Sequence, residues 1–192
     1  MYDQVCKELD VQFERIGSLT VAIYDEQLPL LADLVKRAAL NGVPVKLLTP
    51  AEAKAMEPNL SDNVKGALWA PTAGVIDPFE LCVHLMENAI DNGVTLKLNE
   101  EVVDIRSFGG IWEVRTKKNT YHAKYVINAS GLQADHISGL VAPQTFKITP
   151  RKGEYFVIDY TQPALVKHTI FPLPSSLGKG ILVSPTYGGN YI

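Results

Sequence analysis

The sequence predicts a mixed α+β fold, and three observations support that prediction. An amphipathic helix at 77–92 leads directly into a strand at 95–98, a connection typical of α/β domains. Short strands within 101–123 are separated by turn residues, as in an antiparallel meander. The 192 residues are 46% hydrophobic and 20% charged, so the chain has enough apolar surface to offset the entropy lost on folding.

Helices and strands are predicted to alternate through the first half of the chain. Strands are expected at 16–24, 45–48 and 64–70, and helices at 1–11, 26–41, after Thr49 and at 77–92. Thr49 and Glu52 match a capping box, and Asp77 and Glu80 match a second one. In both, proline occupies the first helical position, where its missing N–H costs nothing.

The second half of the chain is predicted to be richer in strands. They are expected at 95–98, 101–107, 111–116, 121–123, 125–129, 146–149, 154–159, 168–172 and 181–184, with one helix at 133–140. Gly109 and Gly110 mark one hairpin turn, and 117–119 mark another.

Charge and apolar patterning exclude several classes of protein. The chain has 18 Lys and Arg against 21 Asp and Glu, so it lacks the basic surface that nucleic acid requires. No apolar run approaches the roughly 18–20 residues that cross a bilayer, so no transmembrane segment is expected. Cys6 and Cys82 form neither a metal-binding spacing nor a disulfide framework, which favours a cytoplasmic location.

Two segments contain residue types that suit a ligand. A strand at 125–129 leads through Ala129, Ser130 and Gly131 into a helix; small residues admit a ligand, and a helix start favours phosphate. The alternative is an ordinary strand–helix turn. Arg151 and Lys152 are adjacent cations that can clamp an anion, and the alternative there is a solvated strand end.

Several segments, taken in order, resemble one family of FAD-dependent oxidoreductases. It includes D-amino-acid oxidase, glycine oxidase, the flavin-linked glycerol-3-phosphate dehydrogenases and L-2-hydroxyglutarate oxidase. The matching segments are 46–57, 66–81, 92–105 and 125–137. The tail, at 148–159 and 168–190, resembles the glycerol-3-phosphate dehydrogenase and L-2-hydroxyglutarate oxidase branch.

The resemblance implies a domain organisation. It assigns 1–75 and 141–192 to a substrate domain with an antiparallel-rich sheet, and 76–140 to part of a doubly wound FAD-binding domain. Family members begin with a Gly-x-Gly-x-x-Gly loop that holds the FAD pyrophosphate, and this sequence contains no such loop. We therefore interpret the chain as an internal fragment of a longer protein, called the parent below, and expect the chain alone to bind FAD weakly or not at all.

The resemblance also implies sites. The backbone of Val102 corresponds to an adenine contact, and Ala129, Ser130 and Gly131 to the approach of the dinucleotide. Arg151, Tyr155 and His168 are candidates to face the substrate; in a regular strand Arg151 and Tyr155 share one face. No metal site is expected, and no catalytic base is assigned.

The implied activity of the parent is oxidation of a small anionic alcohol, glycerol-3-phosphate dehydrogenase-like, by hydride transfer to flavin. One alternative is an L-2-hydroxyglutarate or other 2-hydroxy or amino acid oxidase. Another is a stand-alone, non-catalytic binding module. Peripheral membrane association of the parent stays open. An unrelated hydrolase or transferase is disfavoured, because the sequence has no nucleophile elbow and no Walker loop.

The doubly wound topology leads to one structural expectation. Strands 95–98 and 125–129 would not be neighbours in such a sheet, so each would expose an unpaired edge in this chain. We expect these strands to pair with each other or with other segments of the chain, or two chains to associate across this edge.

Overall fold

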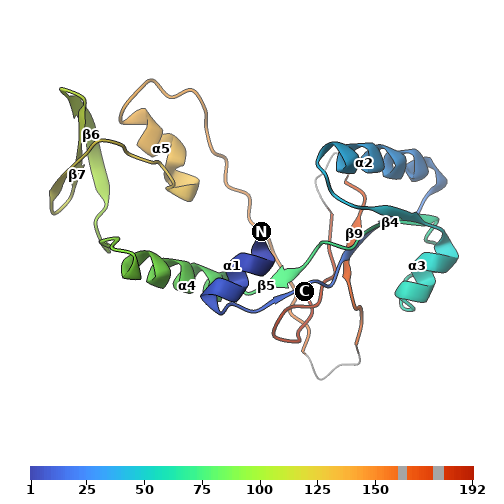
Figure 1. Cartoon of the computed structure of the whole chain (residues 1–192). Helices are drawn as coiled ribbons and strands as arrows, with labels where there is room; N and C mark the ends of the chain where they lie inside the picture. Colours follow the sequence, from blue (N-terminus) through green and yellow to red (C-terminus); the bar gives the residue numbers. More distant parts are fainter. Residues whose placement is uncertain (160–163, 175–179) are drawn as a thin grey trace. The chain divides into compact units, whose positions relative to one another are not determined.

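The chain folds into two compact units of mixed helix and strand, which confirms the mixed fold class. The structure is a computed structural model that describes residues 1–159, 164–174 and 180–192 (Figure 1). Unit 1 comprises Met1–Asn92 and Tyr155–Ile192, and unit 2 comprises Gly93–Glu154. The described part of the chain contains no helix long and apolar enough to cross a membrane.

Unit 1 is built on a four-stranded mixed sheet. Its strands are β3 (Lys46–Leu48), β4 (Gly66–Ala70), β2 (Ser18–Ala22) and β9 (Thr169–Pro172), in that spatial order. β2 is antiparallel to β4 and parallel to β9. The sheet therefore places β9, from the C-terminal part of the chain, beside β2, from the N-terminal part.

Helices cover both faces of this sheet (Figure 1). α2 (Leu28–Leu40) buries Leu31 against Leu68 and Leu173 on one face. α3 (Pro50–Met56) buries Ala53 against Leu19 and neighbouring residues on the other face. The predicted capping box is present at α3, because the Thr49 N–H donates to Glu52 Oε2 at 2.8 Å and the Glu52 N–H donates to Thr49 Oγ1 at 3.2 Å.

The rest of unit 1 forms a second, smaller assembly. α1 (Tyr2–Leu9) packs against α4 (Pro78–Asp91), and β1 (Phe13–Glu14) pairs with β5 (Val75–Ile76). Asp77 caps α4 by accepting the N–H groups of Phe79 and Glu80, but the Glu80 side chain does not return a hydrogen bond to the Asp77 backbone, so the predicted capping box is only half formed. A short 3₁₀ turn, η1 (Asp25–Gln27), precedes α2.

Unit 2 contains the predicted antiparallel meander. β6 (Val102–Phe108), β7 (Ile111–Thr116) and β8 (Thr120–Ala123) lie in sequence order. Gly109 and Gly110 make the first hairpin turn at φ values of 57° and 82°, which an L-residue rarely adopts. η2 (Gly131–Gln133) and α5 (Ala134–Gly139) follow the meander.

Several predicted strands are absent. Residues 95–98, 125–129 and 146–149 form no strand. The 154–159 and 181–184 segments contribute isolated bridges, from Ile158 to Tyr191 and from Val183 to Ile170. The prediction that 95–98 and 125–129 pair with each other or with another segment of the chain is therefore wrong for the described residues. A strand is defined by its partner, and local β propensity cannot supply one. Association of two chains across this edge stays a prediction.

Candidate cofactor and substrate sites

The turn that follows residues 125–127 is shaped by one side chain, Asn128. Its Oδ1 accepts hydrogen bonds from the Ser130 N–H at 3.3 Å and from Ser130 Oγ at 2.6 Å, and its Nδ2 donates to the Ala134 carbonyl at 2.8 Å. Asn128 therefore fixes the path of Ala129, Ser130 and Gly131 into η2. This role of Asn128 was not predicted, although an Asn before small residues is a known turn signal.

Ala129, Ser130 and Gly131 are all exposed on this turn. Gly131 has φ 56°, and a Cβ placed there would meet no atom within 4 Å. Glycine is thus required for its backbone conformation rather than by crowding, and the space over the turn is open to a ligand.

Val102 presents its backbone to the open edge of the meander. The Lys117 N–H donates to the Glu101 carbonyl at 3.0 Å. In an antiparallel pair of strands, this bond places the facing residues Val102 and Thr116 in a non-hydrogen-bonded position, where neither residue bonds to the other. The N–H and C=O of Val102 consequently point away from β7. In the described part of the chain no strand pairs with that edge of β6.

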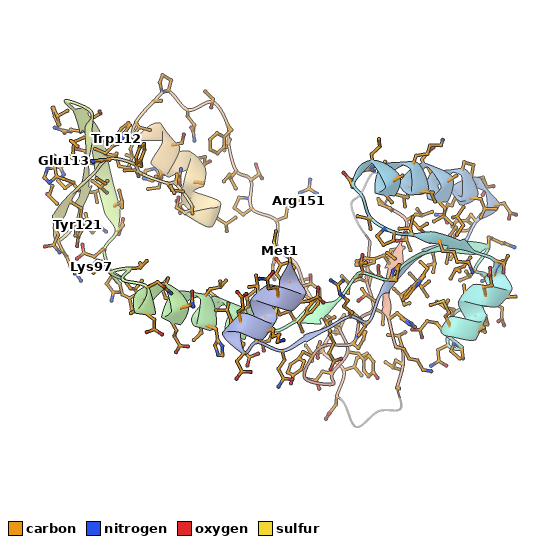
Figure 2. All side chains as sticks on the ribbon, viewed as in Figure 1. Met1, Lys97, Trp112, Glu113, Tyr121 and Arg151 are labelled. Atoms are coloured by element: carbon orange, nitrogen blue, oxygen red, sulfur yellow. The ribbon has the colours of Figure 1, made fainter. Side chains whose placement is uncertain are left out.

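A cavity of about 210 Å³ lies within unit 2 beside the Asn128 turn. Its lining is mostly apolar, and Asn128 is the polar residue in it. The lining residues are Ile105, Trp112, Tyr125, Val126, Asn128, Ile137 and Val141. Trp112 is labelled in Figure 2.

Asp135 anchors the segment that follows α5. Its Oδ2 accepts the Ile148 N–H at 2.9 Å and its Oδ1 accepts the His136 N–H at 2.8 Å. The bond from Ile148 is the largest cause that lowers the pKa of the Asp135 carboxyl below its usual value. Asp135 was not singled out in the sequence, because its partner is a backbone group 13 positions away.

Arg151 is exposed and makes no hydrogen bond or ion pair within 1–159, 164–174 and 180–192 (Figure 2). The adjacent Lys152 is paired with Glu154, with 2.6 Å between Nζ and Oε1. Tyr155 is 64% exposed. The structure assigns no strand to 151–157, so the expected shared strand face of Arg151 and Tyr155 is not formed.

His168 is held in a packed contact inside unit 1. Oε1 of Glu57, a side chain only 1% exposed, accepts the N–H groups of Lys167 at 2.8 Å and His168 at 2.7 Å and lies 2.6 Å from His168 Nδ1. The His168 ring packs edge-on against Trp69, with 4.9 Å between ring centroids. These contacts join the end of α3 to the start of β9. No local pattern in the sequence pointed to this role of Glu57.

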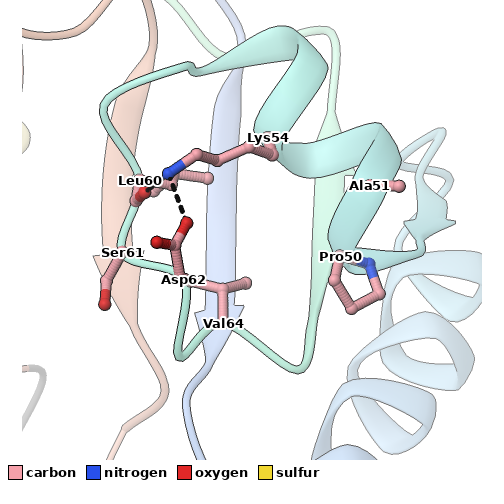
Figure 3. A pocket seen from close by; sticks show the side chains of 7 residues that line it. All are labelled: Pro50, Ala51, Lys54, Leu60, Ser61, Asp62 and Val64. Atoms are coloured by element: carbon pink, nitrogen blue, oxygen red, sulfur yellow. Dashed lines mark hydrogen bonds and ion pairs between the residues drawn. The ribbon is translucent and has the colours of Figure 1, made fainter.

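A further cavity, of about 220 Å³, lies at α3 in unit 1 (Figure 3). Lys54 is the cation in its lining, and its ammonium group contacts Asp62 Oδ1 at 2.8 Å and the Leu60 carbonyl. The Lys54 contact lowers the pKa of the Asp62 carboxyl. Since both partners belong to the loop after α3, the ammonium group closes that loop and is not free for an anion.

Residues 1–192 match the family described as FAD dependent oxidoreductase. The chain belongs to this family. A "Glycerol 3-phosphate dehydrogenase" of Caloramator mitchellensis is 45% identical over 193 residues, covering 100% of this chain and 40% of that protein. An "L-2-hydroxyglutarate dehydrogenase" of Indibacter alkaliphilus is 28% identical, covering 88% of this chain and 43% of that protein.

Solved structures confirm the family fold. The L-alpha-glycerophosphate oxidase of Mycoplasma pneumoniae, solved with FAD bound, matches with a TM-score of 0.86 and 27% identity, covering 94% of this chain and 49% of that one. A glycine oxidase of Bacillus cereus shares the fold, with a TM-score of 0.82 at 22% identity. The chain spans about half the length of these proteins or less.

Proposed function

We propose that this chain is part of an FAD-dependent oxidoreductase that oxidises glycerol 3-phosphate or a closely similar anionic alcohol. The 45% identity to the Caloramator mitchellensis "Glycerol 3-phosphate dehydrogenase", across the whole chain, is the observation on which the proposal depends. When bound, flavin supplies the hydride acceptor, and the protein binds and orients the substrate.

The exposed turn and the open strand edge of unit 2 fit FAD. Ala129, Ser130 and Gly131 are small enough to let a dinucleotide approach the backbone, and the Val102 backbone is free for the adenine. We assign 76–140 to the FAD-binding domain and 1–75 with 141–192 to the substrate domain.

Arg151 is the residue we assign to the anionic group of the substrate. Its guanidinium group is exposed and free of described partners, and such a group binds phosphate or carboxylate in a bidentate manner. Tyr155 offers a second, exposed donor. His168 stays a candidate through Nε2 alone, because Nδ1 is occupied by Glu57.

L-2-hydroxyglutarate is the second candidate substrate. Proteins named "L-2-hydroxyglutarate dehydrogenase" from Indibacter alkaliphilus and Homo sapiens are both 28% identical to this chain. The same Arg151 would then bind a carboxylate.

We place the parent in the cytoplasm, and the free cysteines Cys6 and Cys82 are consistent with that location.

The experiment is anaerobic mixing of the FAD-loaded full-length protein with each substrate. We expect glycerol 3-phosphate to bleach the flavin absorbance with a higher kcat/KM than L-2-hydroxyglutarate. Failure of both substrates to reduce the flavin would contradict the proposal, and a preference for L-2-hydroxyglutarate would support the second candidate.

We expect this chain alone to lose FAD on gel filtration, because the Gly-x-Gly-x-x-Gly loop is absent from its sequence. Flavin absorbance that stays with the chain would contradict that expectation.

A further inference from the structure

Residues 143–154 of unit 2 have no secondary structure, and one hydrogen bond holds their backbone. No helix or strand is assigned to them. The Ile148 N–H donates to Asp135 Oδ2 at 2.9 Å, and no other backbone group of 143–154 bonds to a residue that the structure describes. Ile148 is half-buried, whereas the other residues of this segment are exposed. Asp135 is therefore the anchor of a segment that includes Arg151.

Asp135 is itself held beside the turn that we assign to FAD. Its Oδ1 accepts the His136 N–H at 2.8 Å, which orients the carboxylate. The preceding carbonyl, of Ala134, accepts a hydrogen bond from Asn128 Nδ2 at 2.8 Å, and the same Asn128 side chain shapes the turn at 129–131. Two adjacent residues of α5 thus connect that turn to the anchored segment.

The anchor shortens the length of free chain that leads to Arg151. Arg151 comes three residues after Ile148, a span of at most about 10 Å. Without the anchor, the nearest preceding backbone bond is that of Ala142 to Ser138, nine residues before Arg151 and a span of up to about 30 Å. Effective concentration falls roughly as the −3/2 power of tether length, so a threefold longer tether lowers it about fivefold.

We infer that Asp135 is a positioning residue for the substrate, because its carboxylate holds the segment at 143–154 so that the Arg151 guanidinium group stays within reach of a phosphate or carboxylate. Asp135 acts through the backbone of Ile148 and does not contact the substrate itself. The inference rests on the proposed function, in which Arg151 binds the anionic group. It adds that the turn assigned to FAD and the cation assigned to the substrate are both fixed by the start of α5.

Amide hydrogen exchange on the full 192-residue chain tests the anchor without any substrate. The Ile148 amide should exchange at least about tenfold more slowly than the amides of Lys147 and Arg151, which have no described partner. Asp135→Ala should remove this protection. Asp135→Asn should retain most of it, because a side-chain amide oxygen can accept the same N–H. An unprotected Ile148 amide, or protection that survives Asp135→Ala, would overturn the inference.

Kinetics of the FAD-loaded full-length protein test whether the anchor serves substrate binding. Asp135→Ala should raise KM for glycerol 3-phosphate about fivefold and leave kcat nearly unchanged, since the lost contact is equally strong in ground state and transition state. Asp135→Asn should restore KM. In an Arg151→Ala background, Asp135→Ala should change KM less than about twofold, because the residue that it positions is gone. Equal effects in both backgrounds would show a merely structural role and overturn the inference.

Asp104→Ala is the matched control within unit 2. The Asp104 carboxylate pairs with Arg106 at 2.8 Å and Arg115 at 3.1 Å on the meander, so its loss should leave KM unchanged. Rates are normalised to bound FAD. If the Asp135→Ala protein retains no FAD, Asp135→Glu, which displaces the carboxylate by one methylene, takes its place with the same expected KM.

The two proposals fail in different ways. A wild-type protein whose flavin neither glycerol 3-phosphate nor L-2-hydroxyglutarate reduces would contradict the proposed function, and with it any role of Asp135 in substrate binding. Normal reduction of the wild type together with an unchanged KM in Asp135→Ala would contradict the role of Asp135 alone.

Discussion

The two units of this chain differ in how much apolar surface they bury. Unit 1 has two core clusters, one on each face of its four-stranded sheet, and helices cover both. In residues 93–154, all of which the structure describes, only Ile105 and Thr116 are buried. Unit 1 is therefore held together mainly by its own packing, whereas unit 2 keeps its β-meander but leaves a cavity and an apolar edge open.

The contact between Gly17 and Trp69 gives the largest expected effect. A Cβ at Gly17 would lie 1.8 Å from the Trp69 ring, and Gly17 has φ 68°. We expect Gly17→Ala to destabilise unit 1 by about 4 kcal/mol, because overpacking adds to backbone strain. Urea unfolding followed by Trp69 fluorescence, with Trp112 replaced by Phe, measures unit 1 separately.

Gly42 provides the matched control for this substitution. Its φ of 66° is nearly the same, and a Cβ there would meet nothing within 4 Å. Gly42→Ala should cost only about 1 kcal/mol, the strain of the left-handed conformation alone. Equal losses for the two variants would contradict the proposed role of the Trp69 contact.

Truncation of one buried aliphatic residue in each unit tests the comparison directly. Leu31 is 2% exposed in the α2 cluster, and Ile105 is 5% exposed but borders the 210 Å³ cavity. We expect Leu31→Ala to cost about 3 kcal/mol and Ile105→Ala about 1 kcal/mol, because a side chain beside a void has fewer contacts to lose. Single-tryptophan variants retaining Trp69 or Trp112 report the two unfolding transitions. A larger loss for Ile105→Ala would mean that unit 2 is the better packed.

Arg151 and Lys152 allow a functional comparison within unit 2. Arg151 has no described partner, whereas Lys152 is paired with Glu154. In the parent, Arg151→Ala should lower kcat/KM for the anionic substrate by the equivalent of roughly 1.5–3 kcal/mol, because a charge-assisted contact is lost. Lys152→Ala should have little effect. If kcat/KM for Arg151→Ala equals that of the wild type, Arg151 is only a solvated surface residue.

The sequence predicted local structure well and long-range contacts poorly. The caps at Thr49 and Asp77 are fixed by residues a few positions apart, so the pattern identifies them. The contact from Glu57 to His168 spans 111 positions and depends on α3 meeting β9, which no local pattern encodes. The predicted strand at 125–129 shows the opposite error: its composition favours a strand, but no residue that the structure describes pairs with it.

The smallest expected effect is a pH dependence at the contact between α1 and α4. His84 Nδ1 lies 2.5 Å from the Leu9 carbonyl. This hydrogen bond is the largest cause that raises the pKa of His84 above 6.5, and the charges of Glu87, Glu80 and Asp10 also raise it.

A raised folded-state pKa means that folding favours the protonated ring. The stabilisation is therefore complete below the unfolded-state pKa of 6.5 and is lost as the pH rises through the folded-state pKa. Urea unfolding of unit 1 should accordingly show stability that declines as the pH rises above about 6.5, and His84→Ala should flatten this decline. His122→Ala, at a histidine in β8 of unit 2, should leave the decline unchanged. A decline that persists in His84→Ala would assign the pH dependence to another group.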